Sequence, residues 1–161
     1  MNTLTWEQVC DDKSLHDLPY KIETNGLGQI IMSPARKEHA AYQARIAAIL
    51  YQLMEGGQIL TECAIETDDA TKVADVAWAS TERWSSMDDS ASCSIAPEIC
   101  VEVESWCNTQ REMDLKRSLY IAAGAQEFWF CDLQGRISFF SANRLLASSN
   151  LCPGFPSQIT S

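Results

Sequence analysis

The chain has 161 residues, a formal net charge of −10 at pH 7, and a composition of 46% hydrophobic and 21% charged residues. This length predicts one domain whose single core buries roughly two-thirds of the unfolded surface. The acidic balance argues against tight, non-specific binding to nucleic acid, which needs clustered Lys and Arg, although a local basic patch stays compatible with it. The apolar runs are shorter than the roughly 20 residues of a membrane-spanning helix, so we expect no membrane partner.

The N-terminus and the cysteines indicate the compartment. The first residues are acidic and lack the basic and then apolar order of a secretory signal, so we expect a cytoplasmic protein. The seven cysteines form no C-x-x-C pair and are accompanied by only two histidines. In a reducing compartment we expect small buried side chains and incidental thiols, and no zinc site.

The first third of the chain predicts a short helix, a glycine-linked hairpin and a long helix. Apolar residues at helical spacing indicate the short helix, and alternating apolar and polar residues indicate the hairpin. Three- and four-residue apolar steps indicate the long helix, which a glycine pair ends. The segments are 1–19 for the short helix, 20–24 and 29–32 for the hairpin, and 33–55 for the long helix.

The remainder predicts five strands and one further helix. The strands are expected at 58–65, 72–78, 98–104, 127–132 and 136–140, and the helix between Asn108 or Thr109 and Gly124. We interpret 79–96 as an exposed loop and 141–161 as an irregular tail anchored by Phe155. The order predicts a single α/β or α+β domain over 1–161, with its core at about 20–140: a mixed sheet flanked by helices, with an N-terminal hairpin.

Two carboxylates in apolar strands are the first candidates for chemistry. Asp75 and Glu102 each lie near the middle of a strand with apolar neighbours, where an ionised group is costly unless it is compensated. On adjacent strands they would repel each other unless a divalent cation lay between them, and oxygen ligands favour Mg²⁺ or Mn²⁺. The alternative is that one of them points to solvent or takes a basic partner such as Arg45 or Arg117.

Lys116 is the third candidate, because it borders the apolar face of the helix that follows Glu102. A lysine at this position can extend harmlessly to solvent along the apolar surface. It can also reach the acid pair, orient a water and stabilise negative charge on a phosphate.

Three segments carry a family resemblance: ADVAW around Asp75, VEVES around Glu102, and NTQREMDLKRSLYIAAGAQEFWFCD around Lys116. Together with YKIE and GQIIMSP, they resemble the restriction-endonuclease branch of the PD-(D/E)xK nuclease superfamily that is often called the Uma-two type, from about Tyr20 to Phe140. The resemblance implies a restriction-endonuclease-like fold and a Mg²⁺- or Mn²⁺-dependent endonuclease acting on DNA. In that pattern Asp75, Glu102 and the backbone carbonyl of Val103 bind the metal, and a lysine orients the attacking water.

The chain departs from the superfamily pattern at two positions. Ala74 replaces a proline that is not a ligand. Glu104 replaces the lysine that usually follows the second acid, and Lys116 matches the position on the next helix to which this branch commonly moves that lysine. Glu104 is then a second-metal acid or a solvated strand end, and we favour the strand end.

The same resemblance suggests accessory residues, each with a simpler explanation. Glu23 is expected near the site or as a polar strand residue, and His39 near the site or as a surface helix residue. Tyr120 and Gln126 are weaker candidates. A competing hypothesis is a catalytically inactive nuclease fold that serves as a binding or assembly module, with Trp84 and Trp106 at a protein interface. Members of the superfamily often dimerise, so a homodimer is a further expectation.

Overall fold

The computed structural model describes residues 4–160, so the predicted domain is described except for residues 1–3 and 161. Its helical elements are α1 (Trp6–Asp11), the 3-10 helix η1 (Lys13–Leu15), α2 (Lys37–Leu53), α3 (Thr81–Ser86) and α4 (Gln110–Ala122). Its strands are β1 (Tyr20–Thr24), β2 (Ile30–Pro34), β3 (Gln58–Thr67), β4 (Ala70–Ala79), β5 (Ile99–Val103), β6 (Glu127–Cys131), β7 (Ile137–Ser141) and β8 (Arg144–Leu146). Within residues 4–160 no helix is both long and apolar enough to cross a bilayer.

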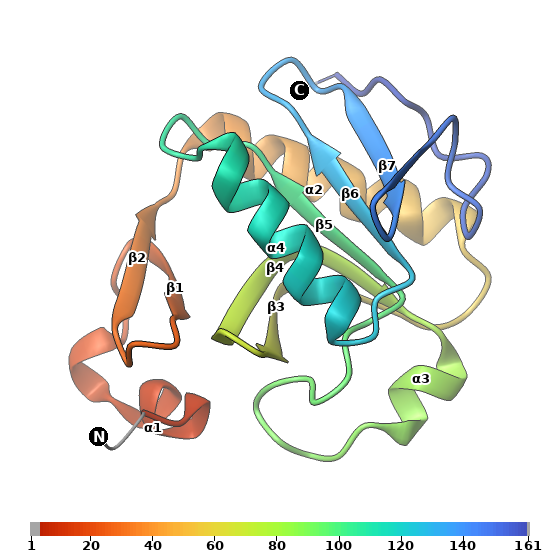
Figure 1. Cartoon of the computed structure of the whole chain (residues 1–161). Coiled ribbons are helices and arrows are strands. Elements are labelled where there is room, and N and C mark those ends of the chain that lie inside the picture. Colours follow the sequence, from red (N-terminus) through yellow and green to blue (C-terminus); the bar gives the residue numbers. More distant parts are fainter. Residues whose placement is uncertain (1–3, 161) are drawn as a thin grey trace.

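Six strands form one mixed sheet in the order β3-β4-β5-β6-β7-β8. The β5–β6 pair is parallel, because α4 returns the chain to the same end of the sheet, and the other pairs are antiparallel. The β1–β2 hairpin forms a separate two-stranded sheet to one side (Figure 1). The predicted fold class, a mixed sheet with flanking helices and an N-terminal hairpin, is confirmed.

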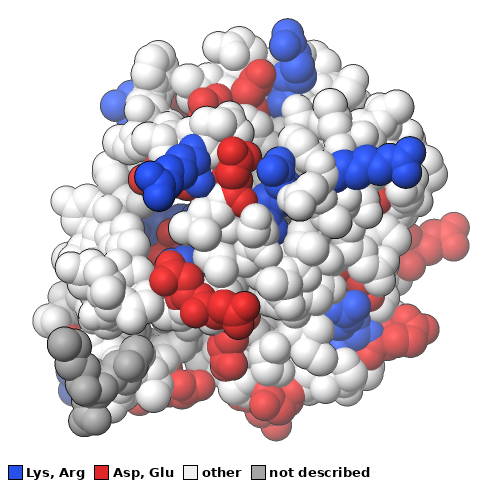
Figure 2. Space-filling view, viewed as in Figure 1, with Lys and Arg blue, Asp and Glu red and all other residues white. Residues whose placement is uncertain are grey.

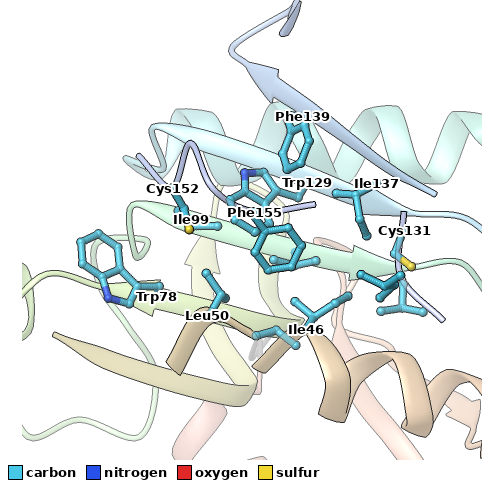
Figure 3. Packing of buried hydrophobic residues seen from close by; sticks show 14 of the residues in the cluster. Ile46, Leu50, Trp78, Ile99, Trp129, Cys131, Ile137, Phe139, Cys152 and Phe155 are labelled. Atoms are coloured by element: carbon cyan, nitrogen blue, oxygen red, sulfur yellow. The ribbon is translucent and has the colours of Figure 1, made fainter. Parts of the chain in front are cut away.

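Helices cover both faces of the six-stranded sheet, with α4 in front of it and α2 behind it in Figure 1. On the α2 face, Ile46 and Leu50 join a core cluster with β-strand residues and with the C-terminal tail. Phe155 from that tail lies beside Trp129, with ring centroids 4.6 Å apart (Figure 3), so its predicted anchoring role is confirmed. On the α4 face, Tyr120 packs with a second cluster of buried residues.

Three predicted segments differ in part from the structure. The long helix begins at Lys37 and not at 33, because β2 continues to Pro34, which pairs with Tyr20 of β1. The predicted loop 79–96 contains α3, whose N-cap Ser80 accepts a hydrogen bond from the Arg83 N–H. The predicted irregular tail contains β8, which extends the sheet beyond β7.

The N-terminus of α4 is fixed by a capping box, which is where the sequence predicted a cap. The Thr109 hydroxyl accepts from the Glu112 N–H at 3.2 Å, and the Glu112 carboxylate accepts from the Thr109 N–H at 2.8 Å. This reciprocal pair satisfies two N–H groups that a helix end leaves without a partner. The helix that carries Lys116 therefore begins at a defined residue.

Thr109→Ala is expected to lower the free energy of unfolding by about 1 kcal/mol, because the backbone N–H of Glu112, in the first turn of α4, loses its acceptor. Urea denaturation measures the change. Ser118→Ala is the matched control, because its hydroxyl lies on the exposed middle of α4 and bonds only the Asp114 carbonyl. An equal loss in both variants would show that the cap contributes nothing specific.

Candidate active site

The site forms where β4 and β5 separate. The paired residues of these strands run from Trp78 and Ile99 to Val76 and Val101. One residue beyond, Asp75 and Glu102 lie at the diverging ends, with exposed fractions of only 1% and 2%. The Val103 N–H donates to Asp75 Oδ2 at 2.8 Å, so the Asp75 carboxylate takes the place of a strand carbonyl. The structure therefore brings the two predicted acids together.

A lysine that sequence analysis did not select lies between the two acids. Lys21 Nζ of β1 is 2.9 Å from Asp75 Oδ1 and 3.5 Å from Glu102 Oε2. The acid pair therefore has a basic partner, as the alternative interpretation predicted, but that partner is neither Arg45 nor Arg117. Arg45 is exposed on α2, and Arg117 pairs with Asp114 at 3.4 Å.

Helix α4 brings two further groups to Glu102. Lys116 and Tyr120 are four residues apart, so they share one face of the helix. Lys116 Nζ is 3.2 Å from Glu102 Oε1, and the Tyr120 hydroxyl donates to the same oxygen at 2.7 Å. The lysine therefore reaches the acid pair and does not extend away from the site.

Glu23 and His39 also lie at this site. Glu23 Oε1 accepts from Lys116 Nζ at 2.7 Å and from the Val73 N–H at 2.8 Å, so it links α4 to β4. His39 Nε2 of α2 is 3.2 Å from Asp75 Oδ2. Glu23 is a polar residue of β1 and His39 is a half-buried residue of α2, and each contacts a member of the site.

Burial and charge shift the pKa values of the two acids in opposite directions. The pKa of Glu102 is raised to about 7, because burial outweighs the opposing effect of the Lys116 and Lys21 ammonium groups. Burial also acts to raise the pKa of Asp75, but Lys21, His39 and the Val103 N–H outweigh it and hold that pKa well below its ordinary value. Asp75 is therefore the stronger acid of the pair, and Glu102 is the weaker.

The pKa values of the two basic partners, Lys21 and His39, are raised. Burial acts to lower the pKa of Lys21, but Glu102, Asp75 and Glu23 outweigh it and raise that pKa above its ordinary value. For His39, burial is outweighed by the hydrogen bond and charge of Asp75, and its pKa is raised. Charge compensation by neighbouring side chains thus makes the burial of three carboxylates tolerable.

Two predicted accessory residues have other roles. Glu104 directly follows the end of β5, as the favoured interpretation expects, but it is half-buried, and its Oε2 accepts from the Leu133 N–H at 3.0 Å. It ties β5 to the turn after β6. Gln126 is exposed next to the start of β6, where its N–H bonds the Glu98 carbonyl at the opposite end of β5 from Glu102.

The acids lie at the base of a cleft of about 980 Å³ between the β1–β2 hairpin, α2 and the region between β5 and α4. Trp106 is 68% exposed on its rim, with the Arg36 guanidinium 5.7 Å from its ring centroid. Basic and acidic side chains are interspersed across the face shown in Figure 2. Within residues 4–160, no three His, Cys, Asp or Glu side chains gather into a metal-binding group.

A mixed sheet with an acid pair at diverging strands and a lysine from the next helix defines a restriction-endonuclease-like domain. The model of the Uma2 family, described as putative restriction endonuclease, matches residues 13–146. The chain therefore belongs to the Uma2 family, as the resemblance predicted.

A solved structure shows the same fold. It is the crystal structure of a putative nuclease belonging to DUF820 from Anabaena variabilis ATCC 29413, with a TM-score of 0.59 and 16% sequence identity over 73% of this chain and 70% of that chain. No curated protein matches the sequence.

Lys21 lies at the acid pair, and the sequence analysis did not select it. The pattern that could have found it is the two-residue spacing of Lys21 and Glu23 in the predicted strand, which places both side chains on one face. Glu23 was expected near the site, so its neighbour on the same face should have been expected there too.

Proposed function

We propose that the protein is a divalent-metal-dependent endonuclease that hydrolyses DNA phosphodiester bonds. The observation that carries this proposal is the 3.2 Å contact between Lys116 Nζ and Glu102 Oε1, beside Asp75. A site that lacks the usual lysine on the strand thereby gains one from α4. Membership of the Uma2 family supports the same activity.

The donor set fits Mg²⁺ or Mn²⁺. Asp75 Oδ1 and Glu102 Oε2 both face one cation position, which the Lys21 ammonium takes. Oxygen donors suit hard divalent cations, which bind through one or two carboxylates and keep several waters. We propose Asp75, Glu102 and the carbonyl of Val103 as the groups that would hold the metal once Lys21 withdraws. The metal would supply Lewis-acid polarisation of the phosphate and lower the pKa of a bound water.

The chain's own residues have distinct parts in this proposal. The Val103 N–H and His39 hold Asp75 Oδ2, and the Tyr120 hydroxyl holds Glu102 Oε1, so both carboxylates are oriented before substrate binds. Lys116 would place a positive charge next to the attacking water and the phosphate, where negative charge develops.

Asp75→Asn tests the proposal directly. We expect Mn²⁺- or Mg²⁺-dependent nicking of plasmid DNA by the wild type, and a loss of at least about 100-fold in the variant, because a proposed carboxylate ligand of the metal is removed. Circular dichroism verifies that the variant is folded. Wild-type protein without cleavage above the variant on single-stranded, double-stranded or structured DNA would contradict the enzyme proposal.

The bridging position of Lys21 also supports a second candidate function, a nuclease fold that acts only as a binding or assembly module. Lys21 already compensates both acids, as it would in a site that never receives a metal. The exposed Trp106 would then contact a protein partner. This candidate predicts no heat of Mn²⁺ binding in calorimetry, whereas the nuclease predicts binding that Asp75→Asn abolishes.

A further inference from the structure

We infer that Lys21 is an internal cation that competes with a divalent metal for the position between Asp75 and Glu102, so that metal binding requires Lys21 to withdraw. This inference rests on the proposed metal-dependent function and adds a control on metal loading at the same site.

The evidence is the division of the carboxylate oxygens between two sets of partners. Asp75 Oδ2 is held by the Val103 N–H and His39, and Glu102 Oε1 is held by Tyr120 and Lys116. The other two oxygens, Asp75 Oδ1 and Glu102 Oε2, both face Lys21 Nζ, at 2.9 and 3.5 Å. Lys21 thus takes the one oxygen of each acid that the α2, β5 and α4 contacts leave for a cation.

Charge repulsion prevents the Lys21 ammonium and a divalent metal ion from occupying this position together. A divalent ion bound by the same two oxygens would lie within a few ångströms of the ammonium, where like charges repel strongly in a buried site. Lysine is suited to such an exchange, because its ammonium is a compact charge on a flexible four-carbon stem. An arginine fork would instead lock both carboxylates.

The cleft beside the acid pair offers space for the Lys21 side chain when it withdraws. It lies on β1, which belongs to the separate hairpin sheet, and its side chain lines the cleft. Its ammonium can therefore move into the cleft without breaking a hydrogen bond of the six-stranded sheet. In the metal-free protein it keeps the acid pair compensated and ordered, at the cost of weaker metal binding.

Calorimetric titration with Mn²⁺ compares the wild type with Lys21→Met, which removes the charge and keeps most of the side-chain volume. We expect the dissociation constant to fall at least about tenfold. Lys37→Met is the matched control, because it makes the same change in net charge at a side chain that is 92% exposed, and it should stay within about twofold of the wild type.

A labelling experiment on the wild type keeps the inference testable if Lys21→Met does not fold. An amine-reactive reagent followed by peptide mass spectrometry should label Lys21 more in the presence of Mn²⁺ than in its absence. Lys72 is the internal reference, because its buried ammonium bonds the Thr24 carbonyl and Asp69, away from the acid pair.

The outcomes separate the inference from the proposed function. Mn²⁺ binding of equal affinity in the wild type and Lys21→Met, or unchanged Lys21 labelling on Mn²⁺ binding, would overturn the role of Lys21 and leave the metal site standing. An absence of Mn²⁺ binding in the wild type and in both variants would overturn both.

Discussion

Glu127→Ala is expected to lower the free energy of unfolding by about 3–5 kcal/mol, because it leaves buried donors without an acceptor. Glu127 Oε2 accepts from Trp129 Nε1 and from the Ser149 hydroxyl, each at 2.7 Å. Its Oε1 accepts from the N–H groups of Asn150 and Leu151, at 2.7 and 3.1 Å. One buried carboxylate thus joins β6 to the C-terminal tail.

The Glu127→Ala variant should also lose stability from the aromatic packing on the α2 face of the sheet. The tail that Glu127 holds carries Phe155, whose ring contacts Trp129, and Trp129 meets Phe139 edge-to-face at 5.1 Å. Releasing the tail would expose these rings to water, which adds lost apolar burial to the lost hydrogen bonds.

Thermal and urea denaturation measure the effect. Glu127→Gln is expected to retain part of the stability, because its amide oxygen can still accept hydrogen bonds. It should not retain all of it, because its NH₂ group would face donors that the carboxylate accepts from. Glu82→Ala, on the exposed first turn of α3, is the matched control and should change stability by no more than about 0.5 kcal/mol. A loss below about 1 kcal/mol in Glu127→Ala would show that the tail is held independently of this carboxylate.

Elements with strong local patterns were predictable from the sequence. The glycine-linked hairpin, the apolar strands and the Thr109 cap each depend on residues close together in the chain, and the structure has them. The extension of β2 to Pro34 depends on its pairing with Tyr20, and β8 depends on its pairing with β7. Such pairing is set by tertiary contacts and not by local propensity.

The acid pair was predictable for a different reason. A carboxylate inside an apolar strand is costly, so Asp75 and Glu102 stand out without knowledge of any contact. Lys21 does not stand out, because a lysine in an alternating edge strand is ordinary. Its partners are 54 and 81 residues away in the sequence, and only the folded chain brings them together.

The same dependence on tertiary structure applies to Glu127. It begins a strand, where a charged residue attracts no notice, and three of its four donors come from the C-terminal tail, 22 to 24 residues away. The sequence therefore identified carboxylates whose burial cost follows from their apolar neighbours in the chain. It did not identify residues whose partners lie in distant segments.

Lys116→Met is expected to reduce DNA cleavage by at least about 100-fold while the Mn²⁺ dissociation constant changes by less than about tenfold. Lys116 is a cation and cannot be a metal ligand, so its removal should affect charge stabilisation in the transition state more than metal binding. The change leaves Glu23 and Glu102 without one ammonium, but the Val73 N–H still bonds Glu23 and the Tyr120 hydroxyl still bonds Glu102.

Plasmid nicking and calorimetry on the same preparations measure the two quantities. Arg111→Met is the matched control, because it removes one positive charge from an exposed position on α4 and should leave both unchanged within about twofold. Cleavage that survives in Lys116→Met but is lost in Asp75→Asn would reassign the water-orienting role. Lys21 would then be the candidate, because after withdrawing from the acid pair its ammonium would remain in the cleft beside the substrate.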